Sequence, residues 1–220
     1  MKLKSFGCSF IFGTDLRDEG RNGLYKDGSK LTWPALLAND LGYAYQTYAR
    51  PGSGNLQILE SMLNQCCVDE PSVFVIGWTY IDRFDYLHRD QEKWPGTSWT
   101  TILPNEQNES TEIYYKHFHS QLQDKLGALI YIKTAIDTLK QKNIRFIMTY
   151  IDPLIFESEW HCTPAVIELQ NYVKPYMTMF EDKTFLEYTR FNNFPISHVA
   201  HPLEEAHQQA AKLIKSYNLL

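Results

Sequence analysis

The chain has 220 residues, of which 44% are hydrophobic and 21% are charged, and its formal net charge is −5. These values are ordinary for a folded globular protein and exclude an intrinsically disordered chain. The negative net charge, with lysines and arginines mixed among acids, argues against a binder of phosphate backbones, so we expect no nucleic acid partner.

Short apolar blocks alternate with helical patterns along the chain, which is typical of an α/β fold. The clearest block, SVFVIGW at 72–78, is nearly continuous in apolar residues, as a strand inside a parallel sheet requires. We predict one domain over residues 1–220, built as a three-layer α/β/α sandwich around a five-stranded parallel sheet. Its strands are expected at 2–7, 44–49, 72–78, 144–151 and 184–188, and its helices at 33–42, 54–67, 114–141, 164–180 and 203–217.

The alternation lapses over residues 86–112, where Trp94, Pro95, Trp99 and Pro104 stand among polar residues. We expect a long loop insertion here that serves as a lid or binding loop, with a disordered insert as the alternative. Its aromatic side chains could line a site for a sugar or an acyl chain, or could simply pack the loop down.

The N-terminal segment MKLKSFGCSFIFG contains a polar motif that a cleaved signal peptide would remove, and glycine and serine interrupt its apolar residues. No apolar run in the chain approaches the length of a membrane span. We therefore expect an unprocessed cytoplasmic protein with no membrane span.

Polar residues follow the first three expected strands, at the edge of the sheet where parallel α/β proteins bind ligands. Ser9 comes directly after the first strand, in FGCSF, where its hydroxyl is either a nucleophile or a plain helix cap. The segment ARPGSGN at 49–55 offers backbone N–H groups and the Asn55 amide to an oxyanion, or makes an ordinary turn. Thr79 follows the third strand and places a hydroxyl at the same edge.

Near the C-terminus, SHVAHP at 197–202 precedes the last expected helix and carries His198 and His201. A neutral imidazole is the usual general base for a hydroxyl nucleophile, so a loop histidine at this edge of the sheet suits Ser9. The spacing of the two histidines alone makes no metal site, because further ligands are missing, and we expect neither a metal nor another cofactor.

These blocks, in this order, resemble those of the SGNH or GDSL-like serine hydrolase superfamily: a serine block, a glycine block, a Gly-x-Asn-Asp block and a C-terminal Asp-x-x-His. The closer resemblance is to a branch seen in phage and marine bacterial sequences, with blocks FGCSFTFG, ARPGSSN, IGWT…R and HP. Here they stand as FGCSFIFG at 6–13, ARPGSGN at 49–55, VIGWTYIDR at 75–83 and HVAHP at 198–202. The resemblance spans nearly the whole chain. It implies a flavodoxin-like SGNH hydrolase fold and an esterase for small esters, either carbohydrate acetyl esters or lipid-like esters.

The resemblance also implies a role for each matching residue. Ser9 matches the nucleophile, and His201 matches the base that deprotonates it. The backbone N–H groups of Ser9 and Gly52 match oxyanion donors, with Asn55 as a helper. Thr79 stands where the superfamily has a donor asparagine.

Three positions depart from the superfamily pattern. Cys8 replaces the usual aspartate beside the serine, as it does in the branch with the FGCSF block. Thr79 is a shorter donor than asparagine, and losing one oxyanion donor commonly costs about 10²- to 10³-fold in rate. His198 occupies the place of the aspartate that orients the base; it could accept a hydrogen bond from His201 but supplies no negative charge. Asp152, after the fourth strand, or a backbone carbonyl is the alternative orienting group.

Two other functions stay open at this point. The first is a catalytically degenerate SGNH domain that binds a ligand or a protein, which the departures at Thr79 and His198 would allow. The second is a flavodoxin-like nucleotide-binding module that uses the loop after the first strand. The segment GCSFIFG argues against the nucleotide-binding module, because it offers few glycines and no lysine to phosphates.

Overall fold

The computed structural model describes residues 1–19, 28–87 and 99–220. A parallel sheet forms its centre, in the strand order β2-β1-β3-β6. Parallel pairing throughout the sheet, with helices between the strands, confirms the predicted α/β fold. The four strands are β1 (Lys2–Phe6), β2 (Ala44–Thr47), β3 (Ser72–Trp78) and β6 (Arg145–Tyr150).

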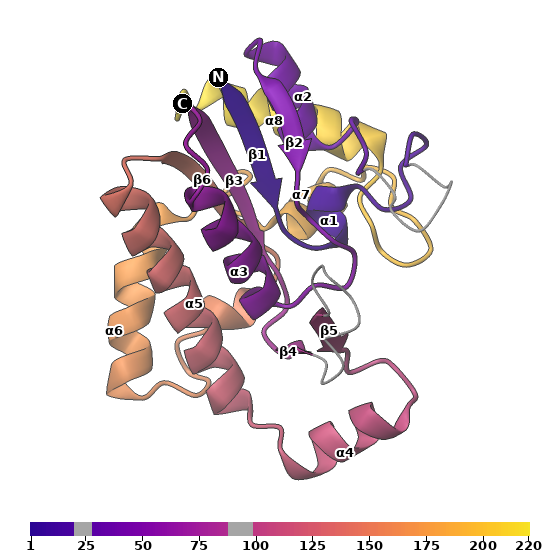
Figure 1. The fold of residues 1–220 in the computed structure, drawn as a ribbon. Helices are drawn as coiled ribbons and strands as arrows, with labels where there is room; N and C mark the ends of the chain where they lie inside the picture. The colour runs from indigo at the N-terminus through magenta and orange to yellow at the C-terminus, as the bar shows by residue number, and fades with distance from the viewer. Residues whose placement is uncertain (20–27, 88–98) are drawn as a thin grey trace, which may run out of the picture.

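Helices cover both faces of the sheet, which gives the predicted three layers (Figure 1). Because successive side chains of a strand point to opposite faces, Val75 packs into one core while Phe74 and Ile76 pack into the other. The helices on the Val75 face are α2 (Trp33–Asp40), α7 (Phe185–Phe191) and α8 (Glu204–Ser216). Those on the opposite face are α3 (Asn55–Cys66), α5 (Gln121–Gln141) and α6 (Pro164–Val173).

The fifth strand predicted at 184–188 is wrong, because these residues begin α7. The Thr184 hydroxyl accepts from the Glu187 N–H and the Glu187 carboxylate accepts from the Thr184 N–H, a capping box that starts a helix. The place beside β6 is taken by Met177, which forms an isolated parallel bridge with Met148. The described part of the sheet therefore has four strands and one bridging residue at its edge.

The predicted loop insertion at 86–112 contains regular structure. Strand β4 (Phe84–Leu87) pairs antiparallel with β5 (Trp99–Ile102), and α4 (Glu109–His117) begins before the expected loop ends. The rings of Phe84 and Tyr114 stack with centroids 4.4 Å apart and hold α4 to the hairpin. Residues 88–98, which include Trp94 and Pro95, lie outside the described residues.

Two predicted helices differ from the structure: one is divided in two, and the other ends early. The helix predicted at 114–141 is divided into α4 and α5, because the Ser120 hydroxyl accepts from the Gln123 N–H and starts a new helix. The helix predicted at 164–180 ends at Val173 and continues only as the 3₁₀ turn η3 (Lys174–Tyr176), since Pro175 has no N–H to donate. None of the helices in the described residues is both long and apolar enough to cross a membrane.

A short helix, α1 (Ser9–Phe12), follows β1 at the carboxyl end of the strand (Figure 1). It lies close against the sheet because Gly7 and Gly77 have no side chains. A Cβ atom on either glycine would lie 2.6 Å from Cγ1 of Ile11. Ser9 is therefore the first residue of a helical turn that packs directly on the ends of β1 and β3.

Candidate active site

Ser9 and His201 are 192 positions apart in the sequence and meet at the carboxyl edge of the sheet. The Nε2 atom of His201 lies 3.0 Å from the Oγ atom of Ser9. The imidazole packs edge-on against the ring of Phe10, with centroids 5.7 Å apart. With its proton on Nδ1, this imidazole accepts the Ser9 hydroxyl hydrogen bond, which is the geometry of a general base beside a nucleophile.

The other ring nitrogen of His201 contacts Asp15, a residue that the sequence did not single out. The Oδ2 atom of Asp15 lies 2.7 Å from Nδ1 of His201. A carboxylate at this place accepts the Nδ1 proton and leaves Nε2 free to face Ser9. The hydrogen bond to His201 holds the pKa of Asp15 below its ordinary value, against a smaller opposing effect of burial. Asp15 is therefore ionised at neutral pH.

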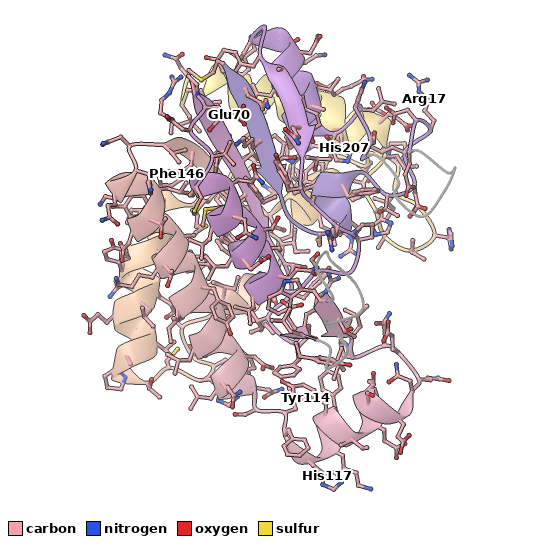
Figure 2. All side chains as sticks on the ribbon, viewed as in Figure 1. Arg17, Glu70, Tyr114, His117, Phe146 and His207 are labelled. Atoms are coloured by element: carbon pink, nitrogen blue, oxygen red, sulfur yellow. The ribbon has the colours of Figure 1, made fainter. Side chains whose placement is uncertain are left out.

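The turn that carries Asp15 is anchored on both sides. Asp15 has a φ of 71°, a left-handed conformation that aspartate tolerates better than most residues but that costs about 1 kcal/mol. The Asp15 N–H donates to the Glu19 carboxylate over 3.0 Å. The Arg17 N–H donates over 3.0 Å to Glu204 in the first turn of α8 (Arg17 is labelled in Figure 2). These two bonds hold the strained turn with its carboxylate toward His201.

A tight loop presents His201 from the other side. The Ser197 N–H donates to the His201 carbonyl over 2.8 Å, and Ala200 between them has a φ of 66°. The Ser197 hydroxyl oxygen accepts from the His201 N–H, at 3.2 Å, while its hydrogen bond to Asp15 further lowers the pKa of that carboxyl. Ser197 thus connects the loop of the base to the carboxylate that orients it.

The two orienting side chains predicted from the sequence, His198 and Asp152, do not take that place. Within the described residues His198 makes no hydrogen bond to His201, whose two ring nitrogens contact Asp15 and Ser9. The Asp152 carboxylate instead accepts hydrogen bonds from the N–H groups of Ile81 and Leu154, and both bonds are 3.0 Å long. Asp152 is therefore the N-cap of the 3₁₀ turn η2 (Pro153–Phe156). Asp15 comes six residues after Ser9, and its closeness to the serine block was the one sequence signal for it.

The glycine block forms a type II turn beside the serine block. The Ser53 N–H donates to the Arg50 carbonyl over 3.2 Å, with Pro51 second and Gly52 third in the turn; the φ of 81° at Gly52 is the reason that a glycine stands there. The Arg50 N–H donates to the Gly7 carbonyl over 3.0 Å, which fixes the turn next to the end of β1. The Gly52 N–H has no hydrogen-bond acceptor among the described residues, so it is free to donate to an oxyanion.

The predicted oxyanion helper Asn55 has another role. Its Nδ2 atom donates to the carbonyls of Thr79 and Tyr80, over 3.2 and 3.4 Å, and its Oδ1 atom accepts from the Thr79 N–H over 2.9 Å. The amide is therefore occupied in joining the second block to the third. The Thr79 hydroxyl is buried and has no partner within the described residues, so it remains a candidate donor.

No protein-family model matches this chain, and no curated protein matches it. Solved structures do resemble it over its whole length. A lipolytic protein of the G-D-S-L family from Veillonella parvula is 13% identical, with a TM-score of 0.55 and 100% of both chains covered. The esterase EstA from Pseudoalteromonas sp. is 8% identical, with a TM-score of 0.54 and coverage of 98% of this chain and 94% of that one.

A third similar structure is the acetyl xylan esterase Est2A from Butyrivibrio proteoclasticus. It is 14% identical, with a TM-score of 0.50, and the match covers 98% of this chain and 62% of that one. At such low identities the likeness speaks for the backbone arrangement alone. The chain has the fold shared by G-D-S-L lipolytic proteins and carbohydrate esterases.

Proposed function

We propose that the chain is a serine esterase with Ser9 as nucleophile and His201 as general base. The observation that carries the proposal is the unbroken series of contacts from the Ser9 hydroxyl through the imidazole to the Asp15 carboxylate, at 3.0 Å and 2.7 Å. The fold likeness to lipolytic proteins and esterases supports the same reaction class.

In the proposed reaction, Oγ of Ser9 attacks the ester carbonyl carbon while Nε2 of His201 takes the hydroxyl proton. Asp15 stabilises the imidazolium that forms. The N–H groups of Ser9 and Gly52, with the hydroxyl of Thr79, hold the tetrahedral oxyanion. His201 returns the proton to the departing alcohol, and a water molecule then cleaves the acyl-serine to release the acid.

The substrate class that we propose is a small ester, either a carbohydrate acetyl ester or a lipid-like ester. Among the proteins of similar fold, one is an acetyl xylan esterase and another is a lipolytic protein. A single domain over residues 1–220 and a cytoplasmic location also stay proposals that rest on the sequence. The hypothesis of a non-catalytic domain depended on two departures, the missing carboxylate next to His201 and the threonine at position 79 in place of asparagine. The position of Asp15 weakens the first of these arguments.

Labelling with a fluorophosphonate probe tests this function. We expect one adduct, located on Ser9 by mass spectrometry of the digested protein, and turnover of p-nitrophenyl acetate. Ser9→Ala should abolish both, and His201→Ala should slow labelling by about 10³-fold, because a serine without its base is a weak nucleophile. His117→Ala, on the exposed side of α4 (labelled in Figure 2), is the matched control and should label like the wild type.

The opposite result is clear-cut. A folded wild-type protein that gains no adduct and shows no turnover between pH 5 and 9 would rule out an activated Ser9. Labelling that survives unchanged in His201→Ala would show that another group is the base.

A further inference from the structure

The glycine turn is held in place by two side chains from the segment between β3 and α4, Arg83 just before β4 and Asp85 within it. We propose that Arg83 and Asp85 are positioning residues for the oxyanion donor Gly52. The inference rests on the proposed esterase function and adds to it a role for the β4–β5 hairpin, which would couple this hairpin to the rate of the reaction.

The peptide group that joins Ser53 to Gly54 is bound at both of its polar atoms. Nη1 of Arg83 donates to the Ser53 carbonyl over 3.0 Å. The Gly54 N–H donates to Oδ1 of Asp85, also over 3.0 Å. Because a peptide group is planar, fixing its oxygen and its nitrogen fixes the orientation of the whole plane. This plane lies two peptide groups beyond the one that carries the Gly52 N–H, so it fixes the end of the turn that contains the donor.

Asp85 is buried, with 6% of its surface exposed, and its carboxylate is fully used. Besides Gly54, it accepts from the Gln57 N–H over 2.9 Å and from the Thr101 hydroxyl over 2.6 Å. These backbone donors belong to the first turn of α3, whose N-cap residue is Gly54 and so has no side chain of its own to accept them. Asp85, a side chain of β4, thus caps α3, a helix that packs against the main sheet.

The approach of Asp85 leaves no spare room. A Cβ atom on Gly54 would lie 2.5 Å from the Asp85 carboxylate, so only glycine admits the carboxylate at this distance. Arg83 is confined as well, because its guanidinium lies over the ring of Tyr80 at 5.3 Å from the centroid. The two side chains therefore bind one peptide group from fixed positions.

A cap alone would not explain this arrangement. One acceptor suffices to cap a helix, whereas here the Asp85 side chain accepts from the N–H and the Arg83 guanidinium donates to the carbonyl of the same peptide group. Such a double hold matters where a neighbouring N–H must point at one place, since an error of about 1 Å in a catalytic group can cost about 10²-fold in rate.

The test compares Asp85→Asn and Arg83→Met with Asp137→Asn, a matched acid-to-amide change on the surface of α5. Functional sites are first counted by fluorophosphonate titration, and kcat and KM for p-nitrophenyl acetate are then expressed per titrated site. We expect kcat of Asp85→Asn to fall about tenfold to a hundredfold, with KM within about threefold of the wild type. Arg83→Met should lose about tenfold, and Arg83→Lys should recover part of it because it keeps one donor for Ser53.

A further readout and a further variant separate positioning from mere stability. Amide hydrogen exchange of residues 50–57 should quicken in Asp85→Asn, while exchange in β3 stays unchanged. Thr101→Val removes one donor from Asp85 without removing the carboxylate, and should give a smaller loss of kcat if Asp85→Asn does not fold.

Each contrary outcome has one meaning. If Asp85→Asn or Thr101→Val melts at a lower temperature but keeps wild-type kcat per titrated site, Asp85 is a helix cap only and the inference is overturned. If the wild type itself is not labelled at Ser9, the proposed function fails and the inference fails with it. Only in the first case does the wild type hydrolyse the ester.

Discussion

Replacing Asp15 with asparagine would remove one negative charge from the site with little change in shape. The carboxylate lies 2.7 Å from Nδ1 of His201, and the same imidazole lies 3.0 Å from Ser9. During attack by Ser9 the imidazole becomes an imidazolium, so the loss of the charge is felt most in the transition state. Asp15→Asn should therefore lower kcat much more than it changes KM.

The size of the effect follows from the geometry. Two unit charges about 4 Å apart interact by about 4 kcal/mol at an effective dielectric constant of about 20. The side chains of Asp15 and His201 are 30% and 15% exposed, so solvent screens part of this energy. A loss of about 2–4 kcal/mol corresponds to a fall in kcat of about 30- to 1,000-fold.

The assay is p-nitrophenyl acetate hydrolysis per fluorophosphonate-titrated site, with His198→Ala as the control. His198 stands where related sequence patterns place the acid, yet it makes no hydrogen bond to His201 in the described residues, so its removal should change kcat by less than about threefold. An Asp15→Asn protein that keeps a third or more of wild-type kcat would refute the reasoning. So would a His198→Ala protein that loses as much activity as Asp15→Asn.

Four further outcomes are expected. Ser197→Ala should lower kcat about fivefold in the same assay, because one net hydrogen bond near Asp15 is lost; an unchanged kcat would show that the Ser197 hydroxyl does not support the carboxylate. Asp152→Ala should reduce the free energy of unfolding in urea by about 1–3 kcal/mol while kcat per titrated site stays constant, since its carboxylate bonds to the N–H groups of Ile81 and Leu154 and not to His201. Since the pKa of Asp15 is lowered in the folded protein, its bond to His201 stabilises the fold above about pH 4 and is lost as the pH falls through the lower folded value, so urea unfolding of Asp15→Asn should depend less on pH in that acidic range. Burial lowers the pKa of His207 to about 3, so the neutral imidazole supports the fold fully above about pH 6.5. Below that pH the free energy of unfolding should fall by up to about 1.4 kcal/mol per pH unit, and His207→Gln should lose this slope in urea titrations between pH 4 and 7.

The sequence predicted correctly those parts of the fold in which a local residue pattern is compatible with only one type of secondary structure. The strand predicted at 72–78 is β3 residue for residue, because an unbroken apolar run has to be buried on both faces of a sheet. The contact between Ser9 and His201 was also foreseeable, since the carboxyl ends of parallel strands share one edge. The segment TFLEY at 184–188 is apolar enough for either element, and there the capping box of Thr184 and Glu187 outweighs β propensity.

The role of Asp15 could not be read from a local pattern. Its carboxylate faces His201 only because its backbone is left-handed and because Arg17 bonds to Glu204, 187 positions away. Asn55 shows the same limit in the other direction: its residue type suits an oxyanion donor, but the fold uses both ends of its amide to join two blocks. The chemical group that each position supplies was predictable from the sequence. Which residue becomes the hydrogen-bond partner of that group depends on distant parts of the chain.

Ser9 and His201 lie in segments far apart along the chain, so ester hydrolysis requires that the C-terminal segment is docked on the rest of the protein. Loss of hydrolysis therefore reports the undocking of this segment. The imidazole of His207 in α8 (labelled in Figure 2) accepts a hydrogen bond of 3.0 Å from the Trp33 N–H of α2. Together with the bond from the Arg17 N–H to Glu204, it holds the C-terminal segment on the rest of the protein. Local opening of the segment would part base from nucleophile while the sheet stays folded. Activity should then vanish at lower urea than the far-ultraviolet circular dichroism signal, and an inhibitor bridging Ser9 and His201 should bring the two transitions together.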